Sequence, residues 1–468
     1  MRLRWTDALL ALAMAALVSG AAKAEDESLR GEMDEMRQMI LQLQDTVSAQ
    51  AGQIDQQRHV IDRAGIEEVT LGDGSSSGIA SFFENVDMTG WVAVSYFHNL
   101  NDLDTRDLVG GNSGNGCCVP FHPDDNNFSF DQLWFEIGKE ATPDDRAGFF
   151  AEIAFGRVAA LMPEGNGAGG PGIDVGGNNL YLNSAYVEYL ADLGGHDVRF
   201  KMGKFGTVIG AEVAQAPYNW NITRGNVYNL LQPIDHVGFM ASTDLGAGFD
   251  LAIGVINEAF TSQPNTNEGP AALGHLGYSA ESWSISLNGL YGNDGTPSPV
   301  NMNPSDQPTI GIIDLVVSWD VTDKLAFLMN ADYLIRDDEG FADDPNAWGV
   351  SLATRYAWTE RLGTALRYEF VDDDGRVFGC SGAQPVGNVE TECQIHSMTL
   401  TTDFALTSGL TIKGEVRYDL ADLHGNSDDV FFDDDSGARR AAAAAGGVPA
   451  PTRGEDQLLV GVEAIYQF

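Results

Sequence analysis

The last twelve residues, Gln457 to Phe468, alternate between two kinds of side chain with the period of a β-strand. One face holds Leu458, Val460, Val462, Ala464, Tyr466 and Phe468, and the other holds Gln457, Gly461, Glu463 and Gln467. A strand of this kind needs apolar surroundings on one side and water on the other. The pattern therefore predicts the closing strand of a transmembrane β-barrel.

The chain from Val86 onward divides into sixteen alternating segments, joined by connections that are alternately short and long. The segments lie at about 86–99, 127–140, 146–158, 179–190, 198–210, 234–244, 249–258, 270–280, 283–293, 308–320, 324–336, 347–358, 362–373, 394–404, 410–420 and 454–468. The long connections are rich in Gly, Asp, Asn and Pro. An even strand number with this loop asymmetry predicts a 16-stranded antiparallel outer-membrane barrel over residues 86–468, with both chain ends in the periplasm.

A soluble β-sandwich is the alternative for an all-β chain. Its strands are usually about five or six residues long, whereas the segments of this chain are about twice that length. Aromatic residues also fall on the outward face near the segment ends, as in the girdles of membrane barrels. These are Trp283, Tyr291, Trp348, Tyr356 and Trp358. We therefore expect a membrane barrel, and because sixteen strands enclose a water-filled channel, an open pore is the expected function.

The chain before the barrel carries three predictions. Residues 1–24 combine Arg2 and Arg4, an apolar run and Ala22-Lys23-Ala24, which predicts a secretory signal peptide. Residues 25–65 are expected to form a periplasmic α-helical coiled coil of two or three strands, or else an amphipathic helix on another surface. The heptad core is Met33, Met36, Ile40, Leu43, Val47, Gln50, Ile54, Gln57 and Ile61. Residues 66–85 predict a flexible linker.

The chain has a formal net charge of −42 at pH 7, which argues against nucleic acid or anionic lipid as a partner. The acidic residues cluster between the predicted strands, for example at 337–338, 343–344, 372–374 and 428–435. These clusters are candidate outer loops, which would attract divalent cations near a lipopolysaccharide surface. Solvated acidic loops that hold no defined ion are the alternative.

Four cysteines lie in a chain that is expected to reach an oxidising compartment. Cys380 and Cys393 fall in one predicted loop, and a disulfide between them would stabilise the fold by about 3 kcal/mol. Cys117 and Cys118 are adjacent, so a bond between them would be strained, and their state is left open. No Cys-x-x-Cys or nearby His spacing supports a metal site.

Strand parity places charged residues of both signs on the inner wall. The basic candidates for selectivity are Arg199, Lys201, Arg355, Arg367, Lys413 and Arg417, and the acidic candidates are Glu136 and Glu152. The same parity places Asp332, Arg336, Glu188, Glu369, Glu415 and Asp419 inward. A basic wall facing an acidic wall would produce a transverse field that orients dipolar or zwitterionic solutes. Simple hydration of the interior is the alternative.

The third long connection, residues 211–233, differs from the acidic loops because it is rich in apolar and aromatic residues. These are Tyr218, Trp220, Ile222, Val227, Tyr228, Leu230 and Leu231. Such a segment would be poorly placed in open water, so we predict that it folds into the barrel and narrows the channel. Glu212 and Arg224 are then the constriction candidates. Packing against the wall without a role in selection is the alternative.

A family resemblance rests on residues 180–245. The run Arg199-Phe-Lys-Met-Gly-Lys-Phe-Gly-Thr-Val-Ile-Gly-Ala-Glu212, followed by Asn219-Trp-Asn221, Arg224-Gly225 and Pro233-Ile-Asp-His-Val-Gly238, resembles the OmpL-like β-barrel porins. The aromatic end of the chain is similar to the terminal signature of bacterial outer-membrane proteins. The resemblance implies passive outer-membrane transport without a well-defined substrate. The amino-terminal coil is more similar to that of sugar-specific or siderophore-associated porins.

We therefore expect a trimeric diffusion porin of the bacterial outer membrane that passes small hydrophilic solutes without a cofactor, in contact with membrane lipid and lipopolysaccharide. A substrate-specific sugar or siderophore-type channel is one alternative. An envelope anchor, with the coil reaching peptidoglycan, is another. An outer-membrane hydrolase is disfavoured, because the histidines have no serine and acid at recognisable spacing. The histidines considered are His98, His122, His275, His396 and His424.

Overall fold

The computed structural model describes residues 86–100, 121–122, 126–162, 173–175, 178–260, 269–293, 309–337, 345–374, 377, 392–424, 432–433, 453–454 and 456–468. The chain divides into two compact units, Met1–Glu84 and Asn85–Phe468, and the described residues all belong to the second. The predicted signal peptide, coiled coil and linker lie outside the described residues, as do most of the long connections.

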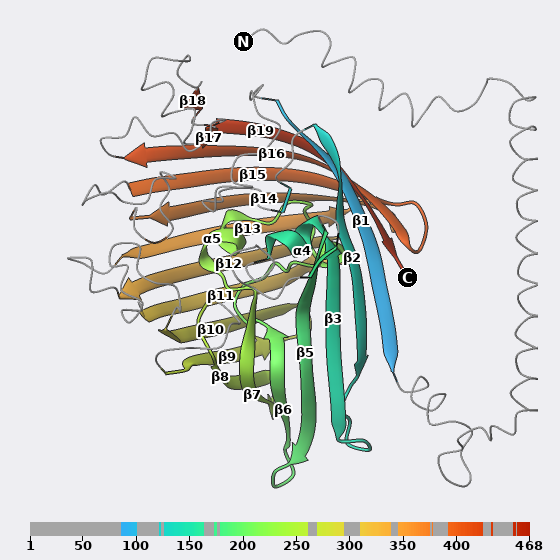
Figure 1. The fold of residues 1–468 in the computed structure, drawn as a ribbon, viewed down its shortest axis with the longest axis vertical. Coiled ribbons are helices and arrows are strands. Elements are labelled where there is room, and N and C mark those ends of the chain that lie inside the picture. The colour runs from blue at the N-terminus through green and yellow to red at the C-terminus, as the bar shows by residue number, and fades with distance from the viewer. Residues whose placement is uncertain are drawn as a thin grey trace, which may run out of the picture. The chain divides into compact units, whose positions relative to one another are not determined.

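Sixteen long antiparallel strands form the wall of this unit within the described residues (Figure 1). They are β1 (Asp87–Asn99), β2 (Asn127–Lys139), β3 (Ala147–Gly156), β5 (Asn178–Asp192), β6 (Asp197–Gly206), β7 (Asp235–Gly246), β8 (Phe249–Ile256), β9 (Ala271–Ser279), β10 (Trp283–Asn293), β11 (Thr309–Thr322), β12 (Leu325–Asp337), β13 (Asn346–Ala357), β14 (Leu362–Asp373), β15 (Glu392–Ala405), β16 (Leu410–His424) and β19 (Asp456–Gln467). Each matches a predicted segment.

The barrel is closed because β1 pairs on one side with β2 and on the other with β19. Trp91 of β1 lies opposite Trp134 of β2 and opposite Gln467 of β19. Closure leaves no unpaired strand edge, which is the condition for a sheet to lie in lipid. The 16-stranded antiparallel barrel predicted from the sequence is therefore confirmed.

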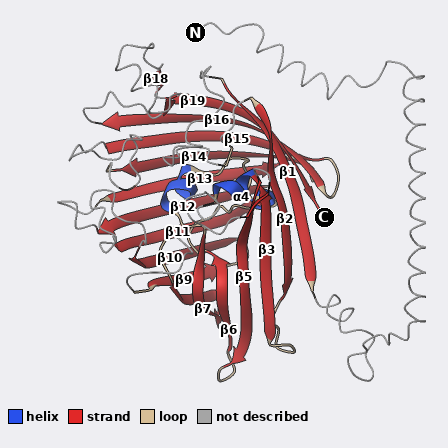
Figure 2. Cartoon of the chain, viewed as in Figure 1, coloured by secondary structure: helices blue, strands red, loops and turns tan. Residues whose placement is uncertain are grey.

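Among the described residues, three short strands and three short helical segments accompany the wall. The strand β4 (Ile173–Val175) adds to β5, and β17 (Phe432–Asp433) pairs with β18 (Arg453–Gly454). The helices α4 (Arg157–Leu161) and α5 (Asn226–Leu231) are drawn in blue in Figure 2, inside the ring of strands, and η1 is a 3₁₀ turn at Ala216–Tyr218. No helix among the described residues is long and apolar enough to cross a membrane.

The short connections all lie at one end of the barrel. One of them is the two-residue turn between β7 and β8, where Ala247 has φ 55° and Gly248 has φ 87°, the left-handed conformation that a tight hairpin requires. The chain end lies at the same barrel end, because the amide of Phe468 donates to the carbonyl of Gly90 at 2.9 Å. We call it the short-turn end.

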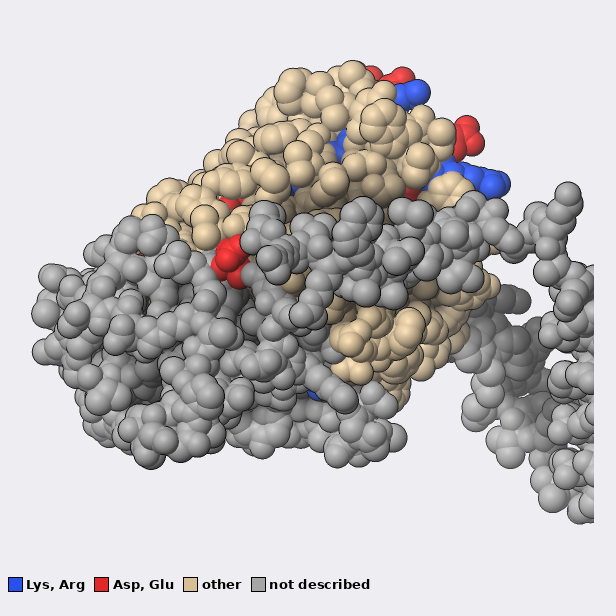
Figure 3. Space-filling model, turned by 90° about the horizontal axis from the view of Figure 1, so that it is seen from above, with Lys and Arg blue, Asp and Glu red and all other residues tan. Residues whose placement is uncertain are grey.

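The wall is apolar on its outer face and polar on its inner face, which is the reverse of the distribution in a soluble protein. On β16, Val416 and Tyr418 point outward and are 45% and 41% exposed, whereas Arg417 and Asp419 point inward and are fully buried. The predicted girdle residues Trp283, Tyr291, Trp348, Tyr356 and Trp358 are exposed on the outside. Figure 3 agrees on the face that it shows, because the described surface there is largely uncharged. An apolar exterior of this kind is suited to lipid.

Two features of the wall differ from the sequence expectation. The predicted strand 198–210 ends at Gly206, because the next residues turn inward and the amide of Gly210 donates to Asp314 at 3.0 Å. On β19, Leu459 and Ile465 share the inner face with Glu463, although both are apolar. They are buried because the barrel interior contains protein here, with Leu459 packed against Phe97 and Ile222.

Candidate functional site

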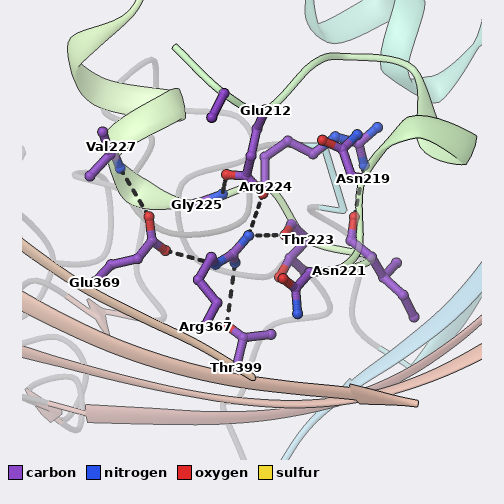
Figure 4. Close-up of polar contacts among 12 residues, drawn as sticks. Glu212, Asn219, Asn221, Thr223, Arg224, Gly225, Val227, Arg367, Glu369 and Thr399 are labelled. Atoms are coloured by element: carbon purple, nitrogen blue, oxygen red, sulfur yellow. Dashed lines mark hydrogen bonds and ion pairs between the residues drawn. The ribbon is translucent and has the colours of Figure 1, made fainter. Parts of the chain in front are cut away.

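The connection between β6 and β7, residues 207–234, lies inside the barrel and is called loop 3. Its contacts reach inward-facing side chains on the opposite wall (Figure 4). Glu415 on β16 accepts hydrogen bonds from the amides of Ile222 at 2.6 Å and Thr223 at 3.1 Å. The helix α5 packs against β12, β13 and β14. The sequence prediction that this apolar segment folds inward agrees with these contacts.

The side chain of Arg224 stabilises the backbone of loop 3, the loop to which it belongs. Its guanidinium donates to the carbonyl oxygens of Ile222 at 2.7 Å, Val213 at 3.0 Å and Ala214. The residue is 2% exposed, and the guanidinium also lies 5.5 Å from the ring centroid of Phe121. Charged donors satisfy several carbonyls at once, so Arg224 holds the loop backbone in a compact turn. In this conformation it presents little surface to solvent.

Glu212 and Arg367 connect loop 3 to the wall. Nη1 of Arg367 on β14 lies 2.5 Å from Oε1 of Glu212 and donates to the carbonyl of Thr223 at 2.9 Å (Figure 4). Nε of Arg367 lies 3.2 Å from Glu369, the next inward residue of β14. The second oxygen of Glu212 accepts from the amide of Gly225 at 2.6 Å. One buried cation thus neutralises two carboxylates that both face the loop.

Two basic residues of β16 hold loop 3 in the same manner. Lys413 donates through Nζ to the carbonyls of Ala216 at 3.2 Å and Asn219 at 2.8 Å. Arg417 donates to the carbonyl of Arg224 at 2.8 Å and pairs with Asp419 at 2.9 Å. Loop backbone without secondary structure needs such partners when it is buried. These wall charges therefore bind the loop.

A polar network on the facing strands was missed by sequence reasoning. The side-chain amide of Asn330 on β12 donates to Asp314 and Asp332, and its Oδ1 accepts from the backbone amide of Ala211 at 3.1 Å. Gln232 of loop 3 donates to Asp332 at 2.6 Å. Asp332 was placed inward by parity, but Asp314 and Asn330 were not singled out. Their signal was a polar residue at an inward position on each of two successive apolar strands.

A second charged cluster lies at the short-turn end, on β2, β3, β5 and β6. Arg199 pairs with Glu188 at 2.5 Å and with Glu140 at 2.9 Å. Nζ of Lys201 lies 4.3 Å from the ring centroid of Tyr186. The side chain of Arg199 is 26% exposed, so this cluster is open to solvent.

Of the remaining predicted residues, Glu136 and Glu152 lie opposite each other on β2 and β3, and Arg355 lies apart from them on β13. Glu136 of β2 is half-buried and has the hydroxyl of Tyr218 at 3.5 Å. Glu152 of β3 is buried and accepts from Asn183 at 2.7 Å and from Gln215 at 2.8 Å. Arg355 of β13 pairs with Asp403 at 2.9 Å, with 31% of its side chain exposed.

The ten candidates therefore divide into two groups. The buried group is Arg224, Arg367, Lys413, Arg417 and Glu152, and the accessible group is Glu136, Arg199, Lys201, Arg355 and Glu212. The buried group binds loop 3 or its supporting side chains. Glu212 is itself a residue of loop 3, and it is counted as accessible because 16% of its side chain is exposed.

Burial around loop 3 shifts the pKa values of ionisable groups in the connections. Burial, reinforced by the charge of Arg224, lowers the pKa of His122 to about 3. Burial raises the pKa of Tyr228 above its ordinary value, and burial together with Glu136 raises that of Tyr218. Within the described ranges, no group of three or more His, Cys, Asp or Glu residues could hold a metal ion. Cys380 lies outside those ranges, and of Cys393 only the backbone in β15 is described, so their disulfide stays a prediction.

Comparisons with known proteins support the geometry. The family model described as "Putative beta-barrel porin-2, OmpL-like" matches residues 85–468. The in-vitro folded outer membrane protein OmpT of Vibrio cholerae is similar with a TM-score of 0.51 and 13% identity, over 82% of this chain and 97% of that one. Its trimer form has a TM-score of 0.50 and 13% identity, over 82% and 99%. No curated protein matches the sequence. At these identities the structural likeness concerns the fold alone.

Proposed function

The chain belongs to the OmpL-like β-barrel porin family and is an outer-membrane channel, and from that premise we propose that loop 3 narrows its interior and sets which small hydrophilic solutes diffuse through it. The observation that carries the proposal is charge on the inside of a closed barrel whose outside is apolar. A water-filled route requires a polar lining, and sixteen strands enclose enough space for one.

We assign different roles to the two groups of charged residues. The buried group fixes the position of loop 3, so Arg224, Arg367 and Lys413 act on the pore through the shape of the loop. The accessible group would meet the solute, because Arg199, Arg355 and Glu136 keep partly exposed side chains in the interior. Both signs occur among the accessible residues, so permeation should depend on solute charge as well as size.

The proposal also covers the orientation of the barrel in the outer membrane and its oligomeric state. The short-turn end faces the periplasm, together with the chain end and the predicted coiled coil, and the long connections face lipopolysaccharide. We propose a homotrimer, as in the trimer form of the Vibrio cholerae protein, and the coil then serves as a trimerisation device or a tether toward peptidoglycan. Transport runs down a gradient, without a cofactor and without enzymatic turnover.

Single-channel conductance in planar bilayers, with a salt gradient across the membrane, tests the proposal. Detergent-extracted protein should insert in large conductance steps, in groups of three for a trimer, and the reversal potential should report the ion preference. Silence from folded protein, judged by its heat-modifiable migration on a gel, would contradict the passive channel. It would then favour the envelope anchor.

A further inference from the structure

A cavity of about 410 Å³ lies at the short-turn end of the interior. Its lining comes from β1, β2, β3, β5 and β6. The side chains that matter chemically are Glu136, Phe150, Tyr186, Glu188, Arg199 and Lys201. The cavity therefore brings charges of both signs and two aromatic rings into one space.

Most of the charges in this cavity neutralise one another, but those of Lys201, Glu136 and the exposed Asp87 do not. Arg199 is engaged by Glu188 at 2.5 Å and Glu140 at 2.9 Å. Lys201 forms no ion pair with any carboxylate of the described residues, and its ammonium lies against the Tyr186 ring. Glu136 likewise pairs with no described cation; it lies opposite Glu152 of β3, with the Tyr218 hydroxyl at 3.5 Å. The Lys201 ammonium and the Glu136 carboxylate are thus available to a solute.

The distance between these two charges selects the size of the solute. Glu136 lies on β2 and Lys201 on β6, with β3 and β5 between them. The register places Lys201 four residues nearer the short-turn end than Glu136, so three strand spacings of about 14 Å combine with an offset of about 13 Å along the strands. The inward side chains shorten this backbone separation, since the Lys201 ammonium reaches back to the Tyr186 ring. The separation favours a solute whose own charges lie several bonds apart over a single α-amino acid.

Two aromatic rings lie between the free charges. Phe150 of β3 and Tyr186 of β5 face each other across a strand pair, with ring centroids 5.6 Å apart. Rings of this kind bind apolar and aromatic groups by contact. A purely anionic solute would meet repulsion from Glu136 and Glu188, a purely cationic one from Lys201 and Arg199, and a neutral one would use neither charge.

We propose that this cavity is a subsite for short amphoteric peptides, with the peptide carboxylate at Lys201, its amino group at Glu136 and an apolar side chain on Phe150 and Tyr186. The inference rests on the proposed channel function, which it extends to a class of solute. Binding is expected to be weak, because a solute that must leave the pore cannot be held tightly.

The probe is glycyl-L-phenylalanine, compared with two analogues that each lack one charge. N-acetyl-glycyl-L-phenylalanine lacks the ammonium, and glycyl-L-phenylalanine amide lacks the carboxylate. Isothermal titration of the detergent-solubilised full chain measures binding, and planar-bilayer recording measures block of the ion current by the same compounds. The free dipeptide should bind about fivefold more tightly than either analogue, from one partly exposed charge contact each.

Charge-removing variants identify the contacts. Lys201→Gln should remove the advantage of the dipeptide over its amide, and Glu136→Gln should remove its advantage over the acetylated form. Arg361→Gln and Glu360→Gln are matched controls, because both residues lie exposed in the turn between β13 and β14 at the same barrel end. These controls should leave all three affinities unchanged.

The outcomes separate this inference from the channel proposal. Ion conductance without dipeptide binding, or equal affinities for all three compounds, overturns the subsite and leaves the channel standing. Dipeptide binding that both Gln variants weaken, in protein that conducts no ions, supports the subsite and overturns the channel. Equal loss in the control variants would also overturn the subsite, because it would show a general charge effect.

Discussion

Arg367 on β14 and Glu212 in loop 3 are 155 positions apart in sequence, yet their charged atoms lie 2.5 Å apart inside the barrel. This ion pair ties the loop to the wall at a point where both partners are largely withdrawn from water. The same guanidinium also faces Glu369 at 3.2 Å. The position of loop 3 thus depends on a single cation shared by two carboxylates.

Replacing Arg367 with methionine should release loop 3. The change leaves Glu212 and Glu369 without their cation, and breaking a buried pair of this kind costs about 3–5 kcal/mol. We expect a lower unfolding temperature, measured by loss of β-sheet circular dichroism, and noisier channel currents. Arg361→Met is the exposed control. A quiet channel with unchanged stability would show that other contacts position the loop.

Arg224→Ala should change both conductance and ion selectivity. The substitution removes a donor that three loop carbonyls share, and hydrogen bonds to a charged group contribute about 1.5–3 kcal/mol each. A loosened loop should widen the passage, so we expect larger single-channel steps and a shifted reversal potential. Arg224→Lys should restore only part of the effect, because lysine lacks the planar fork. Wild-type currents from Arg224→Ala would refute a role for Arg224 in the constriction.

Gly225→Ala should disturb the same region by steric conflict. A methyl group at this position would overlap the carboxylates of Glu369 and Glu212, which lie against the glycine. The carboxylates would have to leave Arg367 or the loop would have to move, and overpacking of this kind costs about 1–3 kcal/mol. Thermal unfolding should report the loss. Gly414→Ala serves as the control, since an added methyl group meets no atom there.

Acid should weaken the packing of His122 against loop 3. The pKa of His122 is lowered to about 3, from an ordinary value of 6.5 that the unfolded chain retains. As the pH falls below about 6.5 the unfolded state binds the proton first, so folding stability decreases until about pH 3. The unfolding temperature should therefore fall between pH 7 and pH 4.

His122→Phe isolates this contribution. The ring of His122 packs 4.6 Å from that of Phe97, so phenylalanine preserves the aromatic contact while removing the titrating group. The variant should lose less stability than the wild type between pH 7 and pH 4. His196→Phe, in an exposed turn, should keep the wild-type pH dependence. An identical pH response of all three proteins would assign the effect to other groups.

Deletion of residues 25–65 tests the predicted coiled coil. If the coil is only a tether, single-channel conductance should stay at the wild-type value and the steps should still come in threes. Loss of the triple steps and of the trimer in native gels would instead identify it as an assembly device. Lower conductance per pore would contradict both roles, because it would place the segment in the channel.

Much of the wall could be predicted because strand alternation is a local property. Residues such as Val416 and Arg417 occupy opposite faces whatever lies beyond them, and lipid and water then decide which face is which. The end of β6 could not be placed in the same way. Gly206 ends the strand because Gly210 turns toward Asp314, a residue 104 positions further along the chain.

The candidate site could be predicted only in part, because its contacts also join residues that are distant in sequence. Parity placed Arg367, Lys413 and Arg417 on the inner face but did not reveal that loop 3 covers them. Leu459 and Ile465 gave a signal, since apolar side chains on an inner face imply that protein and not water lies against them. That signal marks a covered wall without naming the segment that covers it.

The sequence by itself determined the strands, their number, their two faces and the apolar character of loop 3, because each follows from the period and composition of contiguous residues. Only the tertiary structure decided which charges are buried under the loop and which still face the interior. Those contacts join residues such as Glu212 and Arg367, whose meeting depends on barrel closure and on the partners that buried backbone and buried charge require.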